Sequence, residues 1–385
     1  MELNVNRKLL INIFTNAKRI TRKKTTLAIT STALLIAKNN IVKIQASNLD
    51  TWFEDEIQAD IISEGETAIP ITEFLNFIKT LDDEIINLKM TESQWLEIST
   101  KSSKFNLVCM NPDDFPIIQD LSNISMIEIN QYELAEAFRK SSVSVNLNSD
   151  KQYYKVICIK QKDNVLQFAS TNGGRLTYFE SKIDSDIFFK TDENILVQYE
   201  GFAEIYNLIK GKKKVKKGFI NNKIFIGISV QYFVFKKDNL MIVARLIESD
   251  YPDINFLITD IQERDSFKTD VIVGKTYLIN LLKKAKSMQN ENYKGMVVRL
   301  EKNKLTAIFT NPDFGEMKDE LKVDYNGDEI ELALNPSLLL DVINVMDSNF
   351  IRLSIKAKDY PIGILGDKDK GFIGMIMAMR DKKEN

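Results

Sequence analysis

The 385-residue sequence contains no histidine and only two cysteines, Cys109 and Cys158. A chain without histidine has no Ser-His or Cys-His nucleophile pair, no imidazole general base and almost none of the usual zinc sites. Both cysteines lie in apolar, strand-like runs without Cys-x-x-Cys spacing, which is typical of buried free thiols in a reducing compartment. Most enzyme classes are therefore disfavoured, we expect no metal or cofactor, and only lysine or carboxylate chemistry stays open.

Long hydrophobic runs and a strong net charge are also missing. No apolar run approaches the ~20 residues that a membrane-spanning helix needs, and the N-terminal residues lack the pattern of a secretory signal. We therefore expect a cytoplasmic protein without a membrane partner. The net charge is −2, yet basic residues gather at 19–24, 210–217 and 283–286. Such segregation can give a near-neutral protein one basic face, although each group alone is compatible with a solvated loop or helix end.

One pattern occurs three times along the chain. Val5-Asn6, Ile129-Asn130 and Val273-Gly274 each precede a helical run, and each copy continues as helix, strands, helix, strands. A unit of about 125 residues is the size of a whole domain. The sequence therefore predicts three tandem copies of one domain, over residues 1–125, 126–254 and 255–385.

The first helix of the first copy is amphipathic. Leu10 and Phe14 belong to its apolar stripe, whereas Lys8 and Arg19 lie on a polar, net positive face. The other copies follow the same plan, and Asn335 with Pro336 forms a typical helix start. The pattern predicts helices near 7–19, 71–81, 131–140, 200–210, 275–287 and 337–346.

The middle copy contains the most distinctive local motif, Thr-Asn-Gly-Gly-Arg-Leu at 171–176. Asn-Gly-Gly favours a tight turn because glycine accepts positive φ without steric cost, and the turn would present Arg175 beside Leu176. The first and third copies lack the glycine pair, which favours a specialised site over a plain hairpin with a solvated arginine. A phosphate-binding loop is disfavoured because the sequence has no GxxxxGK[ST] pattern.

Two other segments could form binding surfaces. Residues 375–380 hold three of the twelve methionines, and flexible methionine suits a surface that accepts varied apolar side chains; the alternative is the end of a core strand. Tyr153 and Tyr154 beside Lys151 could contact nucleic acid by stacking and charge, or could only pack at the start of a strand.

The adjacent acids Asp113 and Asp114 would point to opposite faces of a strand, which argues against acid–base catalysis.

In their order and spacing, these features resemble the bacterial β sliding clamp family, the processivity subunit of the replicative DNA polymerase. Thr171 to Leu176 is similar to the family's Thr-Asp-Gly-His/Tyr-Arg-Leu, Tyr251-Pro252-Asp253 is shared, and the terminus is similar to Met-Pro-Met-Arg-Leu. The resemblance covers essentially the whole chain. It implies a non-catalytic head-to-tail homodimer ring of six α+β domains, each with two helices packed on antiparallel sheets. Helices would line the hole and contact double-stranded DNA without reading its sequence.

The resemblance also implies site residues. A pocket between the second and third domains would bind a short peptide from the replicative polymerase, the clamp loader or repair polymerases. The matching positions are Thr171, Gly173, Arg175, Leu176, Pro252, Leu257, Ile376, Met377, Met379 and Arg380. The family's DNA contacts correspond to Lys24, Lys151, Tyr153 and Tyr154, and its ring seam to Phe105, Leu107 and Met288.

The sequence departs from the family pattern at several points. Asn172 replaces aspartate, Gly174 replaces histidine or tyrosine, Ala378 replaces proline, and the chain continues past Arg380. We expect these changes to open the pocket and alter its peptide preference. Two other functions stay open: a specialised clamp serving repair or drug tolerance, and an enzyme with lysines and carboxylates between the second and third copies. The role of the lysine-rich segment 211–218 is also open: it could contact DNA, lipid or neither.

Overall fold

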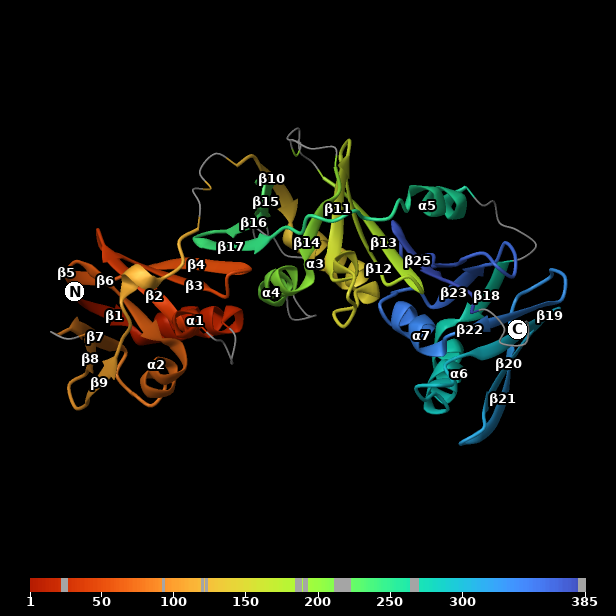
Figure 1. The fold of residues 1–385 in the computed structure, drawn as a ribbon, viewed down its shortest axis with the longest axis horizontal. Helices are drawn as coiled ribbons and strands as arrows, with labels where there is room; N and C mark the ends of the chain where they lie inside the picture. The colour runs from red at the N-terminus through yellow and green to blue at the C-terminus, as the bar shows by residue number, and fades with distance from the viewer. Residues whose placement is uncertain are drawn as a thin grey trace. The chain divides into compact units, whose positions relative to one another are not determined.

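The computed structural model describes residues 1–21, 27–91, 94–118, 121, 124–183, 189, 193–210, 223–263 and 270–379 (Figure 1). Each predicted copy contains the expected order of helix, strands, helix, strands, with one further strand before the first of these helices; in the third copy an additional helix, α5 (Asn255–Gln262), precedes that strand. The α+β class is therefore confirmed. In the described part of the chain, no helix is both long and apolar enough to cross a membrane.

The chain forms two compact units that do not coincide with the three predicted copies. Unit 1 contains Met1–Tyr132, Ser185–Phe189 and Glu200–Leu246, and unit 2 contains Glu133–Asp184, Lys190–Tyr199 and Ile247–Asn385. The middle copy is divided between them. The predicted domain boundaries stay a prediction.

Unit 1 contains two antiparallel sheets, a five-stranded one in the order β5-β1-β7-β8-β9 and an eight-stranded one in the order β10-β15-β16-β17-β4-β3-β2-β6. The larger sheet joins the first and middle copies where Ile242 pairs with Phe53. The strands are β1 (Glu2–Asn6), β2 (Thr32–Lys38), β3 (Ile41–Ser47), β4 (Thr51–Gln58), β5 (Asp60–Ser63), β6 (Gly65–Pro70), β7 (Ile85–Met90), β8 (Trp95–Ser99), β9 (Lys104–Val108), β10 (Met126–Asn130), β15 (Lys223–Ile228), β16 (Tyr232–Lys237) and β17 (Leu240–Arg245).

Two helices of unit 1, α1 (Arg7–Ile20) and α2 (Ile71–Ile78), pack against each other through their apolar faces. The Asn6 side chain caps α1 by accepting hydrogen bonds from two backbone N–H groups. The rings of Phe14 and Phe74 lie 4.5 Å apart between the helices, and both side chains are fully buried. Burying one such ring contributes about 1.5–3 kcal/mol, which is why the predicted apolar stripe became the core face. Helix α4 (Tyr199–Ile209) begins at the border between the units.

Unit 2 contains an eight-stranded sheet in the order β14-β11-β12-β13-β25-β24-β23-β18 and a four-stranded sheet in the order β21-β20-β19-β22. The larger sheet joins the middle and third copies, because β13 pairs with the last strand, β25. The strands are β11 (Val156–Lys162), β12 (Val165–Thr171), β13 (Arg175–Lys182), β14 (Ile195–Gln198), β18 (Asp270–Gly274), β19 (Met296–Glu301), β20 (Lys304–Asn311), β21 (Gly315–Lys322), β22 (Ile330–Leu334), β23 (Phe350–Ser354), β24 (Ile362–Leu365) and β25 (Phe372–Ile376).

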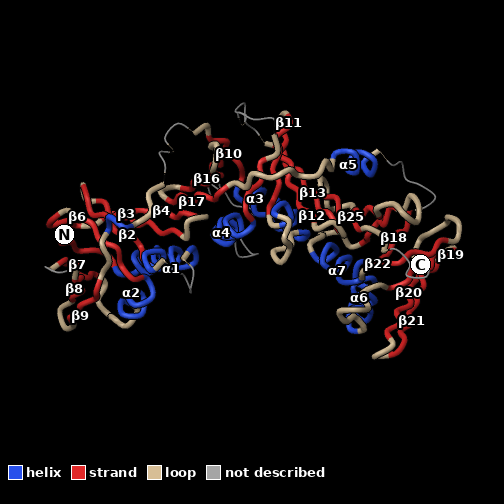
Figure 2. Tube along the Cα trace, in the orientation of Figure 1, coloured by secondary structure: helices blue, strands red, loops and turns tan. Residues whose placement is uncertain are grey.

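Helices cover both faces of the larger sheet of unit 2. Helix α5 (Asn255–Gln262) lies on one side of β13 and β25, and α7 (Pro336–Asn344) lies on the other, as Figure 2 shows. Helix α7 packs with α6 (Lys275–Ser287) in the core of the third copy, and α3 (Gln131–Ser141) belongs mostly to this unit. Asn335 caps α7 as predicted. Helix α5 was not predicted, since only Ile258 and Ile261 mark its buried side.

A buried ion pair links α3 to the third copy. Lys140 Nζ lies 2.9 Å from Asp369 Oδ1, and the side chains are 5% and 0% exposed. Asp369 also accepts hydrogen bonds from the backbone N–H groups of Asp347 and Ser348 and from the Ser348 hydroxyl. Burial alone would raise the pKa of Asp369, but the hydrogen bonds from Ser348, Lys140 and Asp347 outweigh it and hold that pKa below its usual value.

We expect Asp369→Asn to destabilise unit 2 by about 3–5 kcal/mol, because it leaves the buried Lys140 ammonium with only the half-exposed Asp347, 3.5 Å away, as a counter-charge. Urea unfolding followed by circular dichroism would measure the loss. Asp347→Asn is the matched control: its side chain is 56% exposed, so we expect a loss below about 1 kcal/mol. Equal effects of the two substitutions would contradict a buried structural pair.

The same carboxylate predicts a pH dependence. The folded-state pKa of Asp369 is lowered, so its stabilisation is present above the unfolded pKa of about 3.9 and is lost as the pH falls through the folded pKa. Stability of the wild type should therefore fall more steeply below about pH 4 than stability of Asp369→Asn. Parallel curves would show that Asp369 has no lowered pKa.

Candidate functional site

The motif at 171–176 forms the tight turn between β12 and β13, which we call the glycine turn. Gly173 has φ +85°, a conformation that residues with a Cβ rarely adopt. The Thr171 hydroxyl donates to the Arg175 carbonyl at 2.9 Å and accepts from the Gly173 N–H at 3.2 Å. The Asn172 side-chain oxygen accepts from the N–H groups of Gly174 and Arg175. Asn172 thus supplies the acceptor that an aspartate would supply at this position.

Arg175 is not the solvated arginine of the plain-hairpin alternative. Its side chain is 10% exposed, and its Nη1 lies 2.7 Å from Asp341 Oδ2 on α7. The Arg175 Nε is buried and has no hydrogen-bond partner among the described residues. The ion pair therefore ties the glycine turn to a helix of the third copy.

Aromatic residues cover the other side of the glycine turn. A Cβ built at Gly173 would lie 2.5 Å from the Tyr154 hydroxyl oxygen, so the glycine allows this close approach. The rings of Tyr153 and Tyr154 meet edge to face, 4.6 Å apart, and Lys151 Nζ lies 5.8 and 5.5 Å from their centres. Three of the four residues predicted to contact DNA, Lys151, Tyr153 and Tyr154, thus form one cluster, and Tyr154 joins it to the glycine turn.

The methionine-rich terminus runs beside the glycine turn. The Met377 N–H donates to the Gly174 carbonyl at 3.0 Å, and the Met379 N–H donates to the Ala333 carbonyl at 2.7 Å. These bonds fix the backbone while the side chains of Met377 and Met379 stay 41% and 38% exposed. The terminus therefore presents two apolar, adaptable side chains to solvent rather than ending inside the core.

The sheet determines which predicted residues come together. Leu176 is buried with Met375, Tyr178 and Ile258, and Leu257 packs at the edge of this cluster. Ile376 does not reach it: the side chain is 1% exposed and belongs to the core of the third copy, on the opposite face. Sequence reasoning missed Met375 and Ile258. Strand alternation counted back from Met377 could have indicated Met375.

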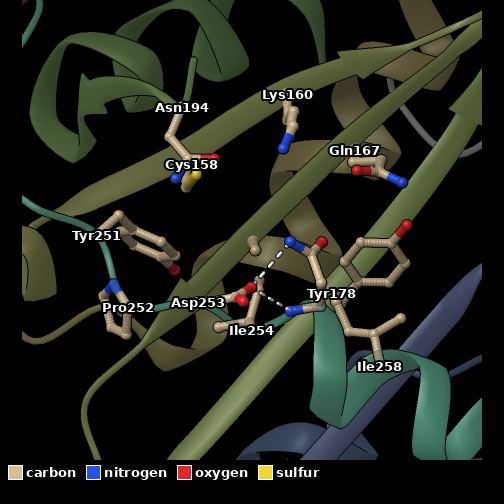
Figure 3. Close-up of a pocket in the computed structure, with 12 residues that line it drawn as sticks. Cys158, Lys160, Gln167, Tyr178, Asn194, Tyr251, Pro252, Asp253, Ile254 and Ile258 are labelled. Carbon is tan, nitrogen blue, oxygen red and sulfur yellow. Dashed lines mark hydrogen bonds between the residues drawn. The ribbon is translucent and has the colours of Figure 1, made fainter. Parts of the chain in front are cut away.

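A cavity of about 190 Å³ adjoins this cluster, between the loop 251–255 and strands β11 to β13 (Figure 3). The predicted residue Pro252 lies at its edge. The cavity is lined by Cys158, Lys160, Gln167, Ala169, Tyr178, Asn194, Tyr251, Pro252, Asp253, Ile254, Asn255 and Ile258.

The remaining predicted residues lie elsewhere. Lys24, Arg380 and the segment 211–218 are outside the described residues. Phe105 and Leu107 belong to β9 in unit 1, where Phe105 is 37% exposed and stacks on Phe77 with the ring centres 4.0 Å apart. Met288 follows α6 in unit 2, so the residues predicted for the ring seam lie in different units of one chain.

The chemistry of the described residues does not favour nucleophilic catalysis. Both cysteines are buried free thiols, as predicted, and burial raises the pKa of Cys158 to about 12. A thiol protonated at neutral pH is a poor nucleophile. No group of histidine, cysteine, aspartate or glutamate side chains suited to a metal ion occurs within the described part of the chain. Exposed apolar side chains around a rigid turn are suited to binding rather than to bond breaking.

Known proteins match this chain over nearly its whole length. Models of the N-terminal, central and C-terminal domains of the DNA polymerase III beta subunit match residues 1–119, 128–253 and 265–380. The Beta sliding clamp of Buchnera aphidicola subsp. Rhopalosiphum padi is 26% identical, over 95% of this chain and 96% of that protein. The Beta sliding clamp of Vibrio cholerae is 23% identical, over 90% and 93%.

The fold has counterparts among solved structures. The DNA polymerase III subunit beta from Pseudomonas aeruginosa matches with a TM-score of 0.89 at 19% identity, over 99% of this chain and 100% of that chain. A putative DNA polymerase III beta subunit from Eubacterium rectale matches with a TM-score of 0.88 at 22% identity and the same coverage. None of these relatives favours the specialised repair clamp or the enzyme that the sequence left open.

We expect Gly173→Ala to displace the Tyr154 ring, because the new methyl group would lie 2.5 Å from its hydroxyl oxygen. The matched control is Gly315→Ala, where φ is also positive but no atom lies within 4 Å. Both variants should lose about 1 kcal/mol to backbone strain. NMR of ¹³C-labelled tyrosine would then show a shifted Tyr154 signal only in Gly173→Ala. An unchanged signal in that variant would refute the contact.

Proposed function

Because the chain belongs to the family of DNA polymerase III beta subunits, the sliding clamps of DNA replication, we propose that two copies close head to tail around duplex DNA. The ring slides along the duplex and holds the polymerase through a short peptide bound beside the glycine turn. This role is non-catalytic. The protein would perform it in the cytoplasm, where the DNA is replicated. The clamp loader and repair polymerases would use the same peptide site.

The observation that supports the peptide site most strongly is the pairing of β13 with β25. It sets Leu176 opposite Met375 and brings Met377 to the glycine turn. We call the site formed by Leu176, Pro252, Leu257, Met375, Met377 and Met379 the docking surface, in which Met377 and Met379 are exposed and Leu176 and Met375 are buried beneath it. Methionine adapts its shape to different apolar partners, and each apolar anchor that a peptide buries contributes about 1.5–3 kcal/mol. One surface can therefore serve several peptides.

Two sheet edges, unpaired among the described residues, support the closed ring. Strand β9 is an edge of the five-stranded sheet, and β21 is an edge of the four-stranded sheet. Strand β21 lies beside α6, to which it is tied by an ion pair between Lys284 and Asp319, and α6 leads to Met288. Exposed edges favour uncontrolled pairing between chains. Pairing β9 of one protomer with β21 of its partner would cover both, and such a head-to-tail contact closes when the rotation allows it.

The proposed contact with DNA is electrostatic. Lys18 and Arg19 lie in the last turn of α1, and Lys284 and Lys286 lie in the last turn of α6. Arg19 is paired with Glu204 in unit 1, so only part of this positive charge is free to meet phosphate. A moderate positive charge gives sequence-independent, salt-sensitive contact with the backbone, which allows sliding.

We expect the protein, loaded by a clamp loader and ATP onto nicked circular DNA, to withstand high salt and to be lost when the circle is linearised. Retention on circles alone shows a topological link, because salt weakens direct phosphate contacts. Gel filtration of each DNA sample with labelled protein measures retention. Phe105→Arg places a charge at the proposed seam and should be lost from both forms. Equal retention of the wild type on circular and linear DNA would refute the ring.

We expect the double substitution Met377→Ala and Met379→Ala to weaken binding of a polymerase-derived peptide about tenfold or more, since each truncation removes an apolar contact at the docking surface. Fluorescence anisotropy with a labelled peptide measures the affinity. Met241→Ala, on β17 in unit 1, is the control and should bind like the wild type. Unchanged affinity of the double variant, with an intact dimer, would remove the docking assignment.

A further inference from the structure

The cavity beside the docking surface has features that peptide docking by apolar anchors does not require. Strands β11, β12 and β13 form its floor, and the loop from Tyr251 to Asn255 covers it (Figure 3). Leu176 and Tyr178 lie two residues apart on β13, so both side chains are on the same face of the sheet. The cavity therefore continues the docking surface past Pro252 toward Tyr178.

The Tyr251 hydroxyl is the first such feature. Its oxygen is buried and has no hydrogen-bond partner among the described residues, and Figure 3 shows the ring reaching from the loop toward the cavity. Burying an unpaired hydroxyl costs about 1–3 kcal/mol. Burial, and secondarily the nearby Cys158, raise the pKa of Tyr251 well above its usual value. The hydroxyl is therefore a hydrogen-bond donor that lacks an acceptor.

One cation, Lys160, and one carboxylate, Asp253, line the cavity. Lys160 lines the cavity and forms no ion pair with any other described residue. The acid at the edge, Asp253, accepts hydrogen bonds from the N–H and side-chain amide of Asn255, at 3.0 and 2.8 Å. The Tyr178 hydroxyl is already used, because it donates to Glu180 at 2.9 Å. Asn194 also lines the cavity, but Tyr251 is the lining residue with a buried side-chain donor that has no partner among the described residues, and Lys160 is the lining cation. Hydrogen bonds to an ionised acceptor are the stronger kind.

The remaining walls are apolar and limit the size of the ligand. Cys158, Ala169, Ile254 and Ile258 supply carbon and sulfur surface. The cavity volume of about 190 Å³ is well above the roughly 10–15 Å³ that one water molecule needs on the same measure. A group of several non-hydrogen atoms, the size of a small ring or one side chain, fits this space.

From these observations we propose that the cavity binds a carboxylate carried by a small apolar body. One carboxylate oxygen accepts the hydrogen bond of the Tyr251 hydroxyl, and Lys160 supplies the positive charge. The carboxylate can come from a free acid or from the last residue of a peptide held on the docking surface. The second source rests on the proposed peptide function, whereas the first does not.

Binding of 4-fluorobenzoate, followed by ¹⁹F NMR, tests the proposal. The neutral 4-fluorobenzamide has the same shape and should bind at least tenfold more weakly. Tyr251→Phe removes only the hydroxyl, and Lys160→Met removes the charge but keeps the length of the side chain. Each should weaken benzoate binding about tenfold and leave benzamide binding unchanged. Tyr360→Phe, at a tyrosine 39% exposed in the third copy, is the matched control and should bind benzoate like the wild type.

Equal binding of benzoate and benzamide, or benzoate binding unaffected by Tyr251→Phe, would overturn the proposal. A polymerase-derived clamp-binding peptide, made with a free terminal carboxylate and as its amide, distinguishes the two sources. If amidation weakens binding to the wild type but not to Tyr251→Phe, the peptide terminus is the source. If amidation has no effect while benzoate binding depends on Tyr251, the source is a free acid.

The experiment separates this proposal from the peptide function. A peptide that fails to bind the wild type in either form would refute the docking surface, and the benzoate titrations would still decide the cavity. The double variant Met377→Ala and Met379→Ala should lose the peptide but retain benzoate. Loss of benzoate in that variant would contradict a cavity whose binding groups are Tyr251 and Lys160.

Discussion

The structure of the candidate site depends on one antiparallel pairing, that of β13 with β25. The pairing connects the middle copy to the last strand of the chain, with Leu176 opposite Met375 and Arg175 opposite Ile376. Side chains alternate between the faces of a sheet, so this register sends Leu176 and Met375 to one face and Ile376 to the other. A shift by one residue would exchange the two sets and remove the apolar surface.

Two ion pairs that involve helices also connect the middle copy to the third copy. Arg175 reaches Asp341 on α7, and Lys140 on α3 meets the fully buried Asp369, three residues before β25 begins. A buried pair is poor evidence for added stability, because desolvation offsets much of the Coulomb attraction. Such pairs can still fix one geometry, and here both cross from the middle copy to the third. They therefore favour a single register for the strand that ends in the methionines.

The departures from the family pattern have local physical consequences. Asn172 keeps the turn closed because its side-chain oxygen accepts two backbone N–H groups. At Gly174, a Cβ would lie 3.3 Å from Leu338 Cδ1 on α7, so a large side chain here would need Leu338 to move. Asn172 thus retains the turn, whereas Gly174 leaves the adjacent side of the pocket without the ring that histidine or tyrosine supplies in the family pattern. Whether this opens the pocket to other peptides stays a prediction.

The sequence by itself determined the three copies, most of their helices and strands, the tight turn at Gly173 and the family. These features depend on local preferences: apolar periodicity, the Asn335 cap and the freedom of glycine at positive φ. Only the tertiary structure decided that β25 pairs with β13 and sets Met375 opposite Leu176, that Tyr154 covers Gly173, and that Tyr251 is buried over a cavity. Each of these depends on strand register and on packing between segments far apart in the chain, which no local pattern encodes.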